Sequence, residues 1–316
     1  FSQRLSRLDP ADGSVLASLE LPQDHYGARL AIAGARAYLT FNFFDAAAGK
    51  YRTALWVLDK TSFSILQKLE FGSDYLYALA LGANGDSLYL SQSGRLWSLR
   101  TDAAGTLVKV SSAASWGLMW DLALDEDGRR LYGAERFSDR VAVIDPATLK
   151  VLKTHPAGQS PAAIVLDLGA GLAFAPNHQS NSVSVYDLKA DTPTVPIDLR
   201  RHEPTALAVA PDAGVALAAC GVTGAVAFLD PKTLKAEKTI PETYGEPTGL
   251  AYFPGLRKAF VRSGTAPNAH IRKVHLDAEE IQTVPYDRWN VSALAAYPEA
   301  GRLLAVQTYL NEPPFN

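Results

Sequence analysis

The chain has 316 residues, of which 47% are hydrophobic and 20% are charged, as is usual for a globular protein that can bury a core. Its formal net charge of −3 gives no electrostatic support for binding nucleic acid, which usually requires a basic domain or stripe. No apolar run approaches the roughly 20 residues that a membrane-spanning helix needs. Cys220 is the only cysteine, which excludes an internal disulfide and a zinc site built on several thiolates.

The first element in chain order is an incomplete unit. Residues 4–21 contain two alternating apolar stretches joined by the turn Asp9-Pro10-Ala11, which predicts two strands of a sheet. No strand pair precedes them in the sequence. The chain starts at Phe1 rather than at a methionine, which fits either a removed signal peptide or a trimmed upstream domain.

A glycine-bearing turn between two apolar stretches then recurs seven times along the chain. The turn glycines are Gly34, Gly85, Gly128, Gly171, Gly214, Gly255 and Gly301, at successive spacings of 51, 43, 43, 43, 41 and 46 residues. Glycine adopts positive φ without steric cost, which tight hairpin turns often need. A period of about 40–45 residues is typical of the blades of a propeller.

A second marker has the same period. An apolar residue followed by aspartate closes a strand at Asp9, Asp59, Asp145, Asp187, Asp230 and Asp277. Aspartate accepts hydrogen bonds from the backbone of the following turn, so the marker has a physical cause. Near Leu99, Arg100 takes the place of the aspartate and Asp102 is displaced. We therefore expect the unit around residues 99–106 to be the least regular.

Between these markers apolar and polar residues alternate, for example in residues 140–144 and 182–186, and convincing helical periodicity is absent. Each unit therefore holds four short strands, A to D, with the glycine turn between A and B and the aspartate turn between C and D. The pattern predicts an all-β fold, a seven-bladed β-propeller of four-stranded antiparallel blades forming a single domain over residues 1–316. Residues 291–309 form an A–B pair with nothing after it. We expect the N-terminal C–D strands to pair with the C-terminal A–B strands and close the ring.

Some units resemble a known repeat. Residues 177–187, NHQSNSVSVYD, resemble the repeat of YVTN-type propellers, in which a strand ending in Thr-Asn is followed by Ser-Asn and a Val-Ser-Val-Ile-Asp strand. Residues 140–148, RVAVIDPAT, are a second match, and residues 38–42, YLTFN, are a partial one. The resemblance implies the propeller fold and a periplasmic or extracellular location, while a cytoplasmic location stays open. It transfers no catalytic residue to this chain.

Candidate binding residues come from the D–A and B–C loops. In propellers of this strand order these loops share one face around the channel mouth, and here they are longer and more varied than the turns of the opposite face. Trp, Tyr and Arg are the usual anchors of binding sites. The predicted ligand or partner contacts are Tyr26, Tyr75, Tyr77, Trp116, Trp120, Arg136, Asn177, His178, His202, Glu246, Arg262, Arg288 and Trp289. The alternative for Trp116, Trp120 and Trp289 is that they wedge neighbouring blades together.

Histidines and the cysteine give weaker signals. His155, His178 and His202 flank one blade, and Glu203 could complete a metal shell around them. No short ligand spacing such as His-x-x-x-His supports such a site, so no cofactor is predicted and a metal ion stays an alternative. Cys220 ends an alanine-rich strand, where a buried structural thiol is favoured over an activated one.

Three functions stay open on the sequence alone. The leading hypothesis is a non-enzymatic propeller of the cell envelope that binds a protein partner or a small molecule through the loop face, with no nucleic-acid partner and no membrane span. It rests on the many aromatic and arginine residues and on the lack of a transferable catalytic motif. The second is a lactonase-like or lyase-like enzyme, metal-assisted in one version, with its site at the channel mouth. The third is a scaffold subunit of a redox complex.

Overall fold

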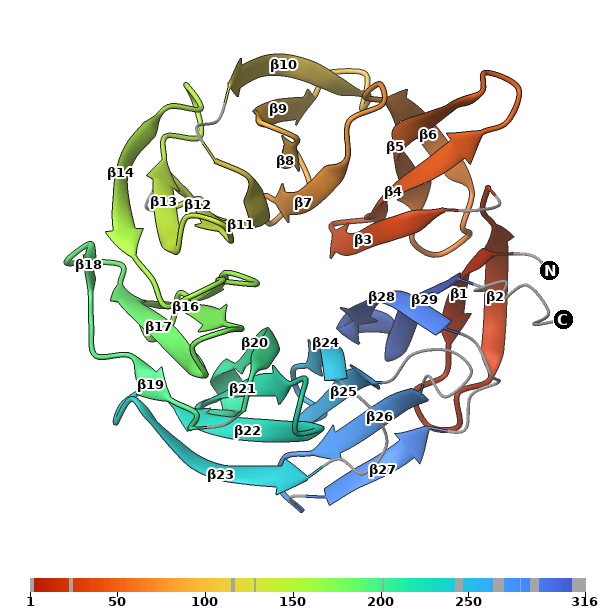
Figure 1. Cartoon of the computed structure of the whole chain (residues 1–316). Helices are drawn as coiled ribbons and strands as arrows, with labels where there is room; N and C mark the ends of the chain where they lie inside the picture. The colour runs from red at the N-terminus through yellow and green to blue at the C-terminus, as the bar shows by residue number, and fades with distance from the viewer. Residues whose placement is uncertain are drawn as a thin grey trace, which may run out of the picture.

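The computed structural model of the chain describes residues 3–22, 25–114, 117–127, 129–200, 202–241, 247–263, 270–278, 280–284 and 290–308. These residues form seven antiparallel sheets set around a central axis, like the blades of a ring (Figure 1). The predicted seven-bladed β-propeller is therefore confirmed. Among the described residues, no helix is long and apolar enough to cross a membrane.

The first four blades each run from an inner strand to an outer one. Blade one is β3 (Tyr26–Ala33), β4 (Arg36–Asp45), β5 (Lys50–Asp59) and β6 (Ile65–Glu70), and blade two is β7 (Leu76–Leu81), β8 (Ser87–Gln92), β9 (Arg95–Thr101) and β10 (Leu107–Ala114). Blade three is β11 (Met119–Asp125), β12 (Arg130–Glu135), β13 (Arg140–Ile144) and β14 (Val151–Pro156). Blade four is β15 (Val165–Asp167), β16 (Leu172–Asn177), β17 (Ser182–Asp187), β18 (Thr192–Pro193) and β19 (Ile197–Asp198).

The remaining blades repeat this order. Blade five is β20 (Pro204–Ala210), β21 (Val215–Cys220), β22 (Ala225–Asp230) and β23 (Lys235–Pro241), and blade six is β24 (Pro247–Phe253), β25 (Lys258–Ser263), β26 (His270–His275) and β27 (Glu280–Val284). Blade seven is β28 (Asn290–Tyr297), β29 (Arg302–Thr308), β1 (Arg4–Leu8) and β2 (Val15–Glu20). Two short 3-10 turns, η1 (Pro211–Ala213) and η2 (Pro298–Ala300), join β20 to β21 and β28 to β29.

Blade seven closes the ring by joining the two ends of the chain. Its strand order is β2-β1-β29-β28, and β1 pairs with β29 in an unbroken register from Arg4 opposite Gln307 to Leu8 opposite Leu303. The predicted pairing of the N-terminal C–D strands with the C-terminal A–B strands is confirmed. The pairing leaves neither half-unit with an open inner edge.

The hydrophobic core lies between the blades. The buried apolar residues form seven clusters, and each cluster draws its members from two consecutive blades. Leu5 of β1 and Leu39 of β4, for example, belong to the cluster between blades seven and one. Both faces of a blade are therefore buried, which is why its middle strands are apolar on both sides.

The turns follow the two predicted markers. Six of the seven turn glycines are described, and all six have positive φ, between 55° and 77°; Gly128 lies outside the described residues. Asp59, Asp145 and Asp230 each accept hydrogen bonds from the turn that follows, which lowers the pKa of all three carboxyls. Asp102 does the same for the amides of Ala104 and Thr106, so the displaced aspartate still shapes its turn.

One expectation about regularity is wrong. The unit around residues 99–106 forms a complete four-stranded blade, because Asp102 replaces the missing aspartate. The irregular blade is instead blade four, whose outer strand is split into β18 and β19. Pro193 and Pro196 lie in this outer segment, and proline has no amide hydrogen to donate to a ladder.

Most of residues 42–52, which lie between the B and C strands of one unit, extend the hairpin of β4 and β5 and do not form one of the expected B–C loops. The two strands pair as far as Asp45 opposite Lys50, and the connection is only four residues long. Asp45 accepts hydrogen bonds from the amides of Ala47 and Ala48, and Gly49 completes the turn with φ of 64°. The aromatic side chains of this segment favour strand over loop, which is the physical reason for the difference.

Closure of the ring can be tested at Leu5. Its side chain is fully buried in the cluster between blades seven and one, so Leu5→Ala should lower the free energy of unfolding by about 2–5 kcal/mol. Leu16 on β2 is 44% exposed, and Leu16→Ala should change it by less than about 0.5 kcal/mol. Urea unfolding of both variants measures the difference. Equal losses would contradict a closing role for this cluster.

The turn glycines give a second test. Gly85 has φ of 75°, and a Cβ there would lie 2.6 Å from the hydroxyl oxygen of Tyr38, which donates a hydrogen bond to the Gly85 carbonyl. Gly214 has φ of 67° with no atom within 4 Å of a Cβ. Both alanine variants should lose about 1–2 kcal/mol from the left-handed backbone. Gly85→Ala should lose at least about 1 kcal/mol more because of the clash, and identical melting curves would refute this.

Candidate binding face and central channel

β-Bulges at the inner strands position side chains at the mouth of the channel. In six inner strands the register with the second strand shifts near the first residue. The residue left without a cross-strand partner is Tyr77 in β7, Trp120 in β11, Thr205 in β20 and Ser292 in β28. A bulge turns its extra residue away from the regular alternation, and bulges are frequent beside functional sites.

Aromatic side chains form a continuous arc on this face across blades one to three. The arc is Phe44, Tyr51, Tyr26, Tyr75, Tyr77, Trp120 and Phe137, in that spatial order, with neighbouring ring centroids 5.1–6.3 Å apart. All seven residues lie at the start of an inner strand, in the D–A loop before it, or at the tip of a B–C connection. We call this set the aromatic arc.

The aromatic arc is open to solvent. Phe137 is 75% exposed, and Tyr51, Phe44 and Tyr75 are 49%, 42% and 41% exposed. Aromatic rings attract one another in edge-to-face and tilted contacts, so these side chains are held in place by their neighbours in the arc without being buried in the core. Large apolar side chains that are exposed together on one face, rather than singly, mark surfaces that bind another molecule.

Arg136 is held against the arc. Its guanidinium carbon lies 4.5 Å from the ring centroid of Trp120, and its Nε donates a hydrogen bond to the Ser160 hydroxyl oxygen at 3.0 Å. The guanidinium is thus held over the ring, in a cation–π contact. Burial lowers the pKa of Arg136 from its ordinary value.

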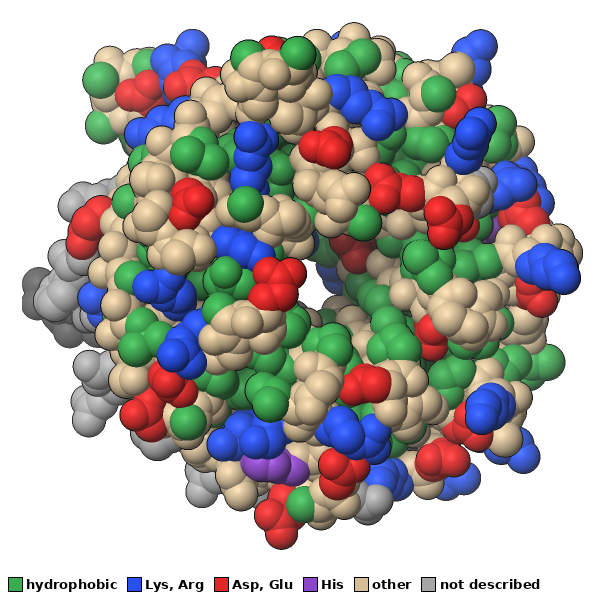
Figure 2. All heavy atoms as spheres, turned by 180° about the vertical axis from the view of Figure 1, so that it is seen from behind, with side chains coloured by type: hydrophobic (Ala, Val, Ile, Leu, Met, Phe, Trp, Pro, Cys, Tyr) green, Lys and Arg blue, Asp and Glu red, His purple; other side chains and the backbone are tan. Residues whose placement is uncertain are grey.

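A cavity of about 510 Å³ occupies the channel, lined by the inner strands of six blades. Much of its wall is small and apolar, from alanine, leucine and valine side chains. Its charged lining residues are Arg29, Asp121, Arg136 and Arg262. Figure 2 shows the central opening from one side of the ring, with basic and acidic side chains at its rim and in its wall.

The charged groups of the channel influence one another. Burial raises the pKa of Asp121 to about 6, although the amide of Ile164 donates to its Oδ2 and the Arg29 charge acts in the opposite direction. Burial also lowers the pKa of Arg262 to about 10, and repulsion from Arg29 adds to this. The Arg262 Nη1 donates to the carbonyls of Val291 and Ser292 at 2.8 and 2.9 Å.

The polar residues predicted around blade four, Asn177 and His178, belong neither to the aromatic arc nor to the channel wall. Asn177 is fully buried, and its amide donates to the hydroxyls of Ser182 and Ser184, so it shapes the B–C turn from inside. His178 and Glu203 are brought together, with Nε2 and Oε2 3.7 Å apart. His178 is therefore paired across blades four and five.

His155 is separate from the other metal candidates. Its Nε2 lies 3.0 Å from Asp191 Oδ1, and its ring lies against Tyr186, between blades three and four. His202 contacts the Thr223 hydroxyl with Nδ1 at 2.6 Å. In the part of the chain that the structure describes, no group of three or more His, Cys, Asp or Glu side chains could hold a metal ion. The candidates His155, His178, His202 and Glu203 are thus not gathered at one point.

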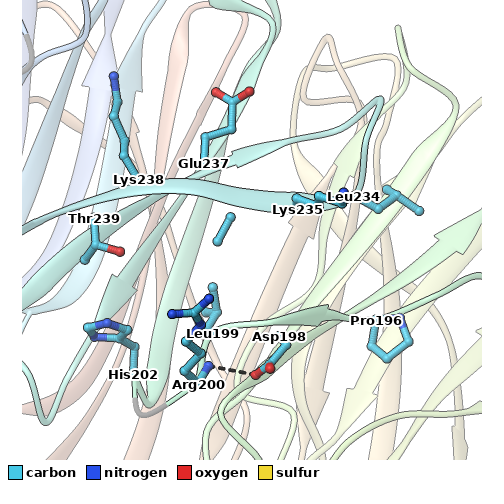
Figure 3. Close-up of a pocket in the computed structure, with 11 residues that line it drawn as sticks. Pro196, Asp198, Leu199, Arg200, His202, Leu234, Lys235, Glu237, Lys238 and Thr239 are labelled. Carbon is cyan, nitrogen blue, oxygen red and sulfur yellow. Dashed lines mark hydrogen bonds between the residues drawn. The ribbon is translucent and has the colours of Figure 1, made fainter.

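A second hollow lies at the outer edge of the ring, between β19 and β23 (Figure 3). It measures about 520 Å³, and of the described residues predicted to form a site it includes only His202. The Arg200 amide donates to Asp198 at 2.7 Å, and in Figure 3 the Glu237 and Lys238 side chains extend away from His202. Its polar groups do not converge, so the loop face and channel are the better candidate site.

Six of the predicted residues lie in this candidate site. The structure gathers the predicted Tyr26, Tyr75, Tyr77, Trp120 and Arg136 in the aromatic arc or beside it, and it places Arg262 in the channel wall. Four further predictions, Trp116, Glu246, Arg288 and Trp289, lie outside the described residues. Trp120 contacts Tyr77 of the neighbouring blade and also lines the channel cavity, so both its binding and its blade-wedge interpretations stay open.

Five residues of the site were missed. Phe44, Tyr51 and Phe137 belong to the arc, and Arg29 and Asp121 to the channel. A charged residue just after the start of an otherwise apolar inner strand was the available signal for Arg29 and Asp121. Cys220 is fully buried as expected, and burial raises the pKa of its thiol to about 12.

Comparisons with known proteins support the fold and give no family. No family model matches the chain, and no curated protein matches it in sequence. Membership of the YVTN-type repeat family therefore stays a prediction. A chain in a solved structure described as "Crystal Structure of Mitotic Checkpoint Complex" is similar, with a TM-score of 0.71 and 13% sequence identity over 90% of this chain and 86% of that chain. At this identity the similarity shows the fold alone.

Asp121 makes stability depend on pH in a defined direction. Because its pKa in the folded state is about 6, above the ordinary 3.8, the folded protein takes up a proton before the unfolded chain does as pH falls. Ionised Asp121 therefore lowers the free energy of unfolding above about pH 6. This destabilisation disappears near pH 4, where the carboxyl is protonated in the folded protein. Asp121→Asn keeps an oxygen that can accept from Ile164, so it should be more stable than the wild type at pH 8 by up to about 3 kcal/mol.

Urea unfolding of the wild type and Asp121→Asn at pH 4, 6 and 8 measures this. The other titrating groups contribute equally to the pH dependence of both proteins, so their contributions cancel in the comparison. They include the turn aspartates, whose lowered pKa values stabilise the fold at high pH. The advantage of the variant should shrink steadily towards pH 4. A difference in unfolding free energy that is the same at all three pH values would contradict the prediction.

Proposed function

We propose that this protein is a non-enzymatic binding propeller that recognises a protein partner through the aromatic arc on its loop face. The observation that carries the proposal is the arc itself. It joins seven aromatic side chains from three blades, and four of them are more than 40% exposed. Four exposed aromatic side chains together on one face differ from the single exposed ones of an ordinary surface, so we account for their exposure by contact with another molecule.

The arc has the chemistry of an interface centre. Tyrosine, tryptophan and arginine contribute most of the binding energy in many protein interfaces, and Trp120 with the stacked Arg136 supplies two of these at one point. Aromatic side chains that already contact one another lose little conformational freedom on binding, because their neighbours restrict them. A partner would present apolar side chains to Phe137 and Tyr75 and an acceptor or carboxylate to Arg136.

An exposed arc across three blades favours a protein over a small molecule. Small ligands are usually enclosed in a concave site, whereas the most exposed residue of the arc, Phe137, projects from a turn. The similar solved structure is described as that of a complex, which agrees with a propeller of this shape serving an assembly. For this chain the partner stays unidentified.

We propose a location in the cell envelope because residues 140–148 and 177–187 resemble YVTN-type repeats. The lactonase-like or lyase-like interpretation needs converging histidines and carboxylates, and no such group of three occurs within the described residues. The redox-scaffold interpretation would use the same face as the proposed interaction, and the partner's identity would distinguish it.

Site-specific photo-crosslinking in living cells tests the proposal. A benzoylphenylalanine replacing Phe137, in the arc, should give a discrete crosslinked product with one protein. The same group replacing Leu256, which is 49% exposed in the A–B turn of blade six on the opposite face, should give none. Tyr75→Ser should reduce the yield at position 137 severalfold, since loss of an aromatic anchor typically costs about 1–2 kcal/mol. Absence of a product at position 137, or the same products at both positions, would overturn the proposal.

A further inference from the structure

The outer strands of five blades follow one pattern. In blades one, two, three, five and seven, the register between the third strand and the outer strand shifts once, close to the start of the outer strand. Four paired residues follow this bulge in each blade. The five segments are residues 17–20, 67–70, 111–114, 153–156 and 238–241. They occupy equivalent positions in the ring, so their sequences can be compared directly.

Four of these segments carry a residue that discourages pairing with another chain. Two end in glutamate, at Glu20 and Glu70, and two end in proline, at Pro156 and Pro241. Charged side chains and prolines are the usual protection of a sheet edge against another strand. Residues 111–114, at the end of β10, are Ser-Ser-Ala-Ala and carry neither protection. We call this segment the open edge.

The open edge is exposed at the perimeter of the ring. β10 is the last strand of its sheet, and in Figure 1 it forms the outer margin of blade two. Three of the four residues of the open edge are exposed, and Val110, the extra residue of the bulge, is 59% exposed. Blade one holds the other end of β10, where the Gln67 side chain bonds to the amide and the carbonyl of Leu107. An edge strand presents a row of unpaired backbone groups to solvent, which is a template for a further strand.

Two basic side chains lie near the open edge. Lys109 is directed away from it, because its Nζ donates to the carbonyl of Glu70 at 2.7 Å and lies 4.0 Å from the ring centroid of Phe71. Arg95 reaches over it, and its Nη1 donates to the Ser112 hydroxyl at 2.9 Å. The open edge itself is neutral, and Arg95 places one positive charge beside it.

We infer that the open edge pairs antiparallel with the open edge of a second copy of this chain, so that two blades form one continuous sheet. In a two-fold pairing each residue faces a residue of the same segment, so a charged segment would meet its own charge. Ser-Ser-Ala-Ala meets only small neutral side chains, which lets the two rings approach closely. The exposed Val110 of each copy adds apolar contact beside the ladder.

The same features make the dimer weak. The bulge confines the ladder to four residues of each chain, and an interface of this size lies at the low end for protein complexes. Pairing also brings the two Arg95 side chains towards each other, and like charges oppose it. We therefore expect a dimer that forms with rising micromolar concentration.

Analytical ultracentrifugation from low micromolar to submillimolar concentration tests this inference. The weight-average mass of the wild type should rise from that of one chain towards that of two. Ser112→Lys should stay at one chain throughout and keep the wild-type melting temperature, because the side chain is exposed and would face its own copy. The matched control is Ser18→Lys, which should dimerise as the wild type does. Ser18 is exposed and holds the equivalent position, second after the bulge, in blade seven. A wild type that stays at one chain, or equal loss of the dimer in both variants, would overturn the inference.

Chemical crosslinking gives a second measurement. Cys220 is the only cysteine of the sequence and is fully buried, so Ser112→Cys introduces the one accessible thiol. At a concentration at which the wild type dimerises, a short bismaleimide should join two copies of Ser112→Cys severalfold more efficiently than two copies of Ser18→Cys. Equal yields would contradict pairing at the open edge. Arg95→Gln should dimerise at least as strongly as the wild type, and a weaker dimer would contradict the same geometry. None of these residues belongs to the aromatic arc, so photo-crosslinking at Phe137 stays a separate test of the proposed partner.

Discussion

Burial of both faces of every blade against its two neighbours is the interaction on which the rest of this structure depends. Each of the seven hydrophobic clusters is shared by two consecutive blades, so a blade removed from the ring would expose two apolar faces at once. The ring is therefore stable only when closed. Leu5 and Leu304, from opposite ends of the chain, pack in one of these clusters and make closure part of the core.

Because the core lies between the blades, the residues that face the channel are not needed for core packing. The inner strands meet the core with their edges and flanks, whereas residues that face the channel contribute little to packing. The bulges in six inner strands increase this freedom, because the extra residue leaves the regular alternation. Trp120 and Asp121 are adjacent in such a bulge, and both line the cavity although one is aromatic and the other acidic.

The fold could be read from the sequence because its signals are local and repeated. The turn glycines and strand-closing aspartates each satisfy a local backbone requirement, and seven repeats make the period visible. The β4–β5 extension was missed because Ala46-Ala47-Ala48-Gly49 has the composition of a loop, while the pairing of Phe44 with Tyr51 depends on both strands together. The split outer strand of blade four could have been read from Pro193 and Pro196.

The candidate site was harder to predict because it depends on distance in space rather than in sequence. Aromatic residues at strand starts identified Tyr26, Tyr75, Tyr77 and Trp120, but only the ring shows that they touch. Phe137 follows Arg136 directly, and nothing in the sequence shows that it continues the arc. Arg29 and Arg262 are 233 positions apart, a separation at which no local pattern could indicate one shared cavity.

The arc and the channel share the side chains that separate them, so the two surfaces are not energetically independent. Trp120 has two neighbours in the arc, Tyr77 and Phe137, and also forms part of the cavity wall, while Arg136, another residue of that wall, lies over its ring. Contact at Trp120 therefore alters the surroundings of the Arg136 charge, and any charge bound beside Arg136 alters the face presented by Trp120. By thermodynamic linkage, such an effect must be equal in both directions. A rigid ring transmits it without a change of fold, because the blades that carry these residues are fixed by their shared cores.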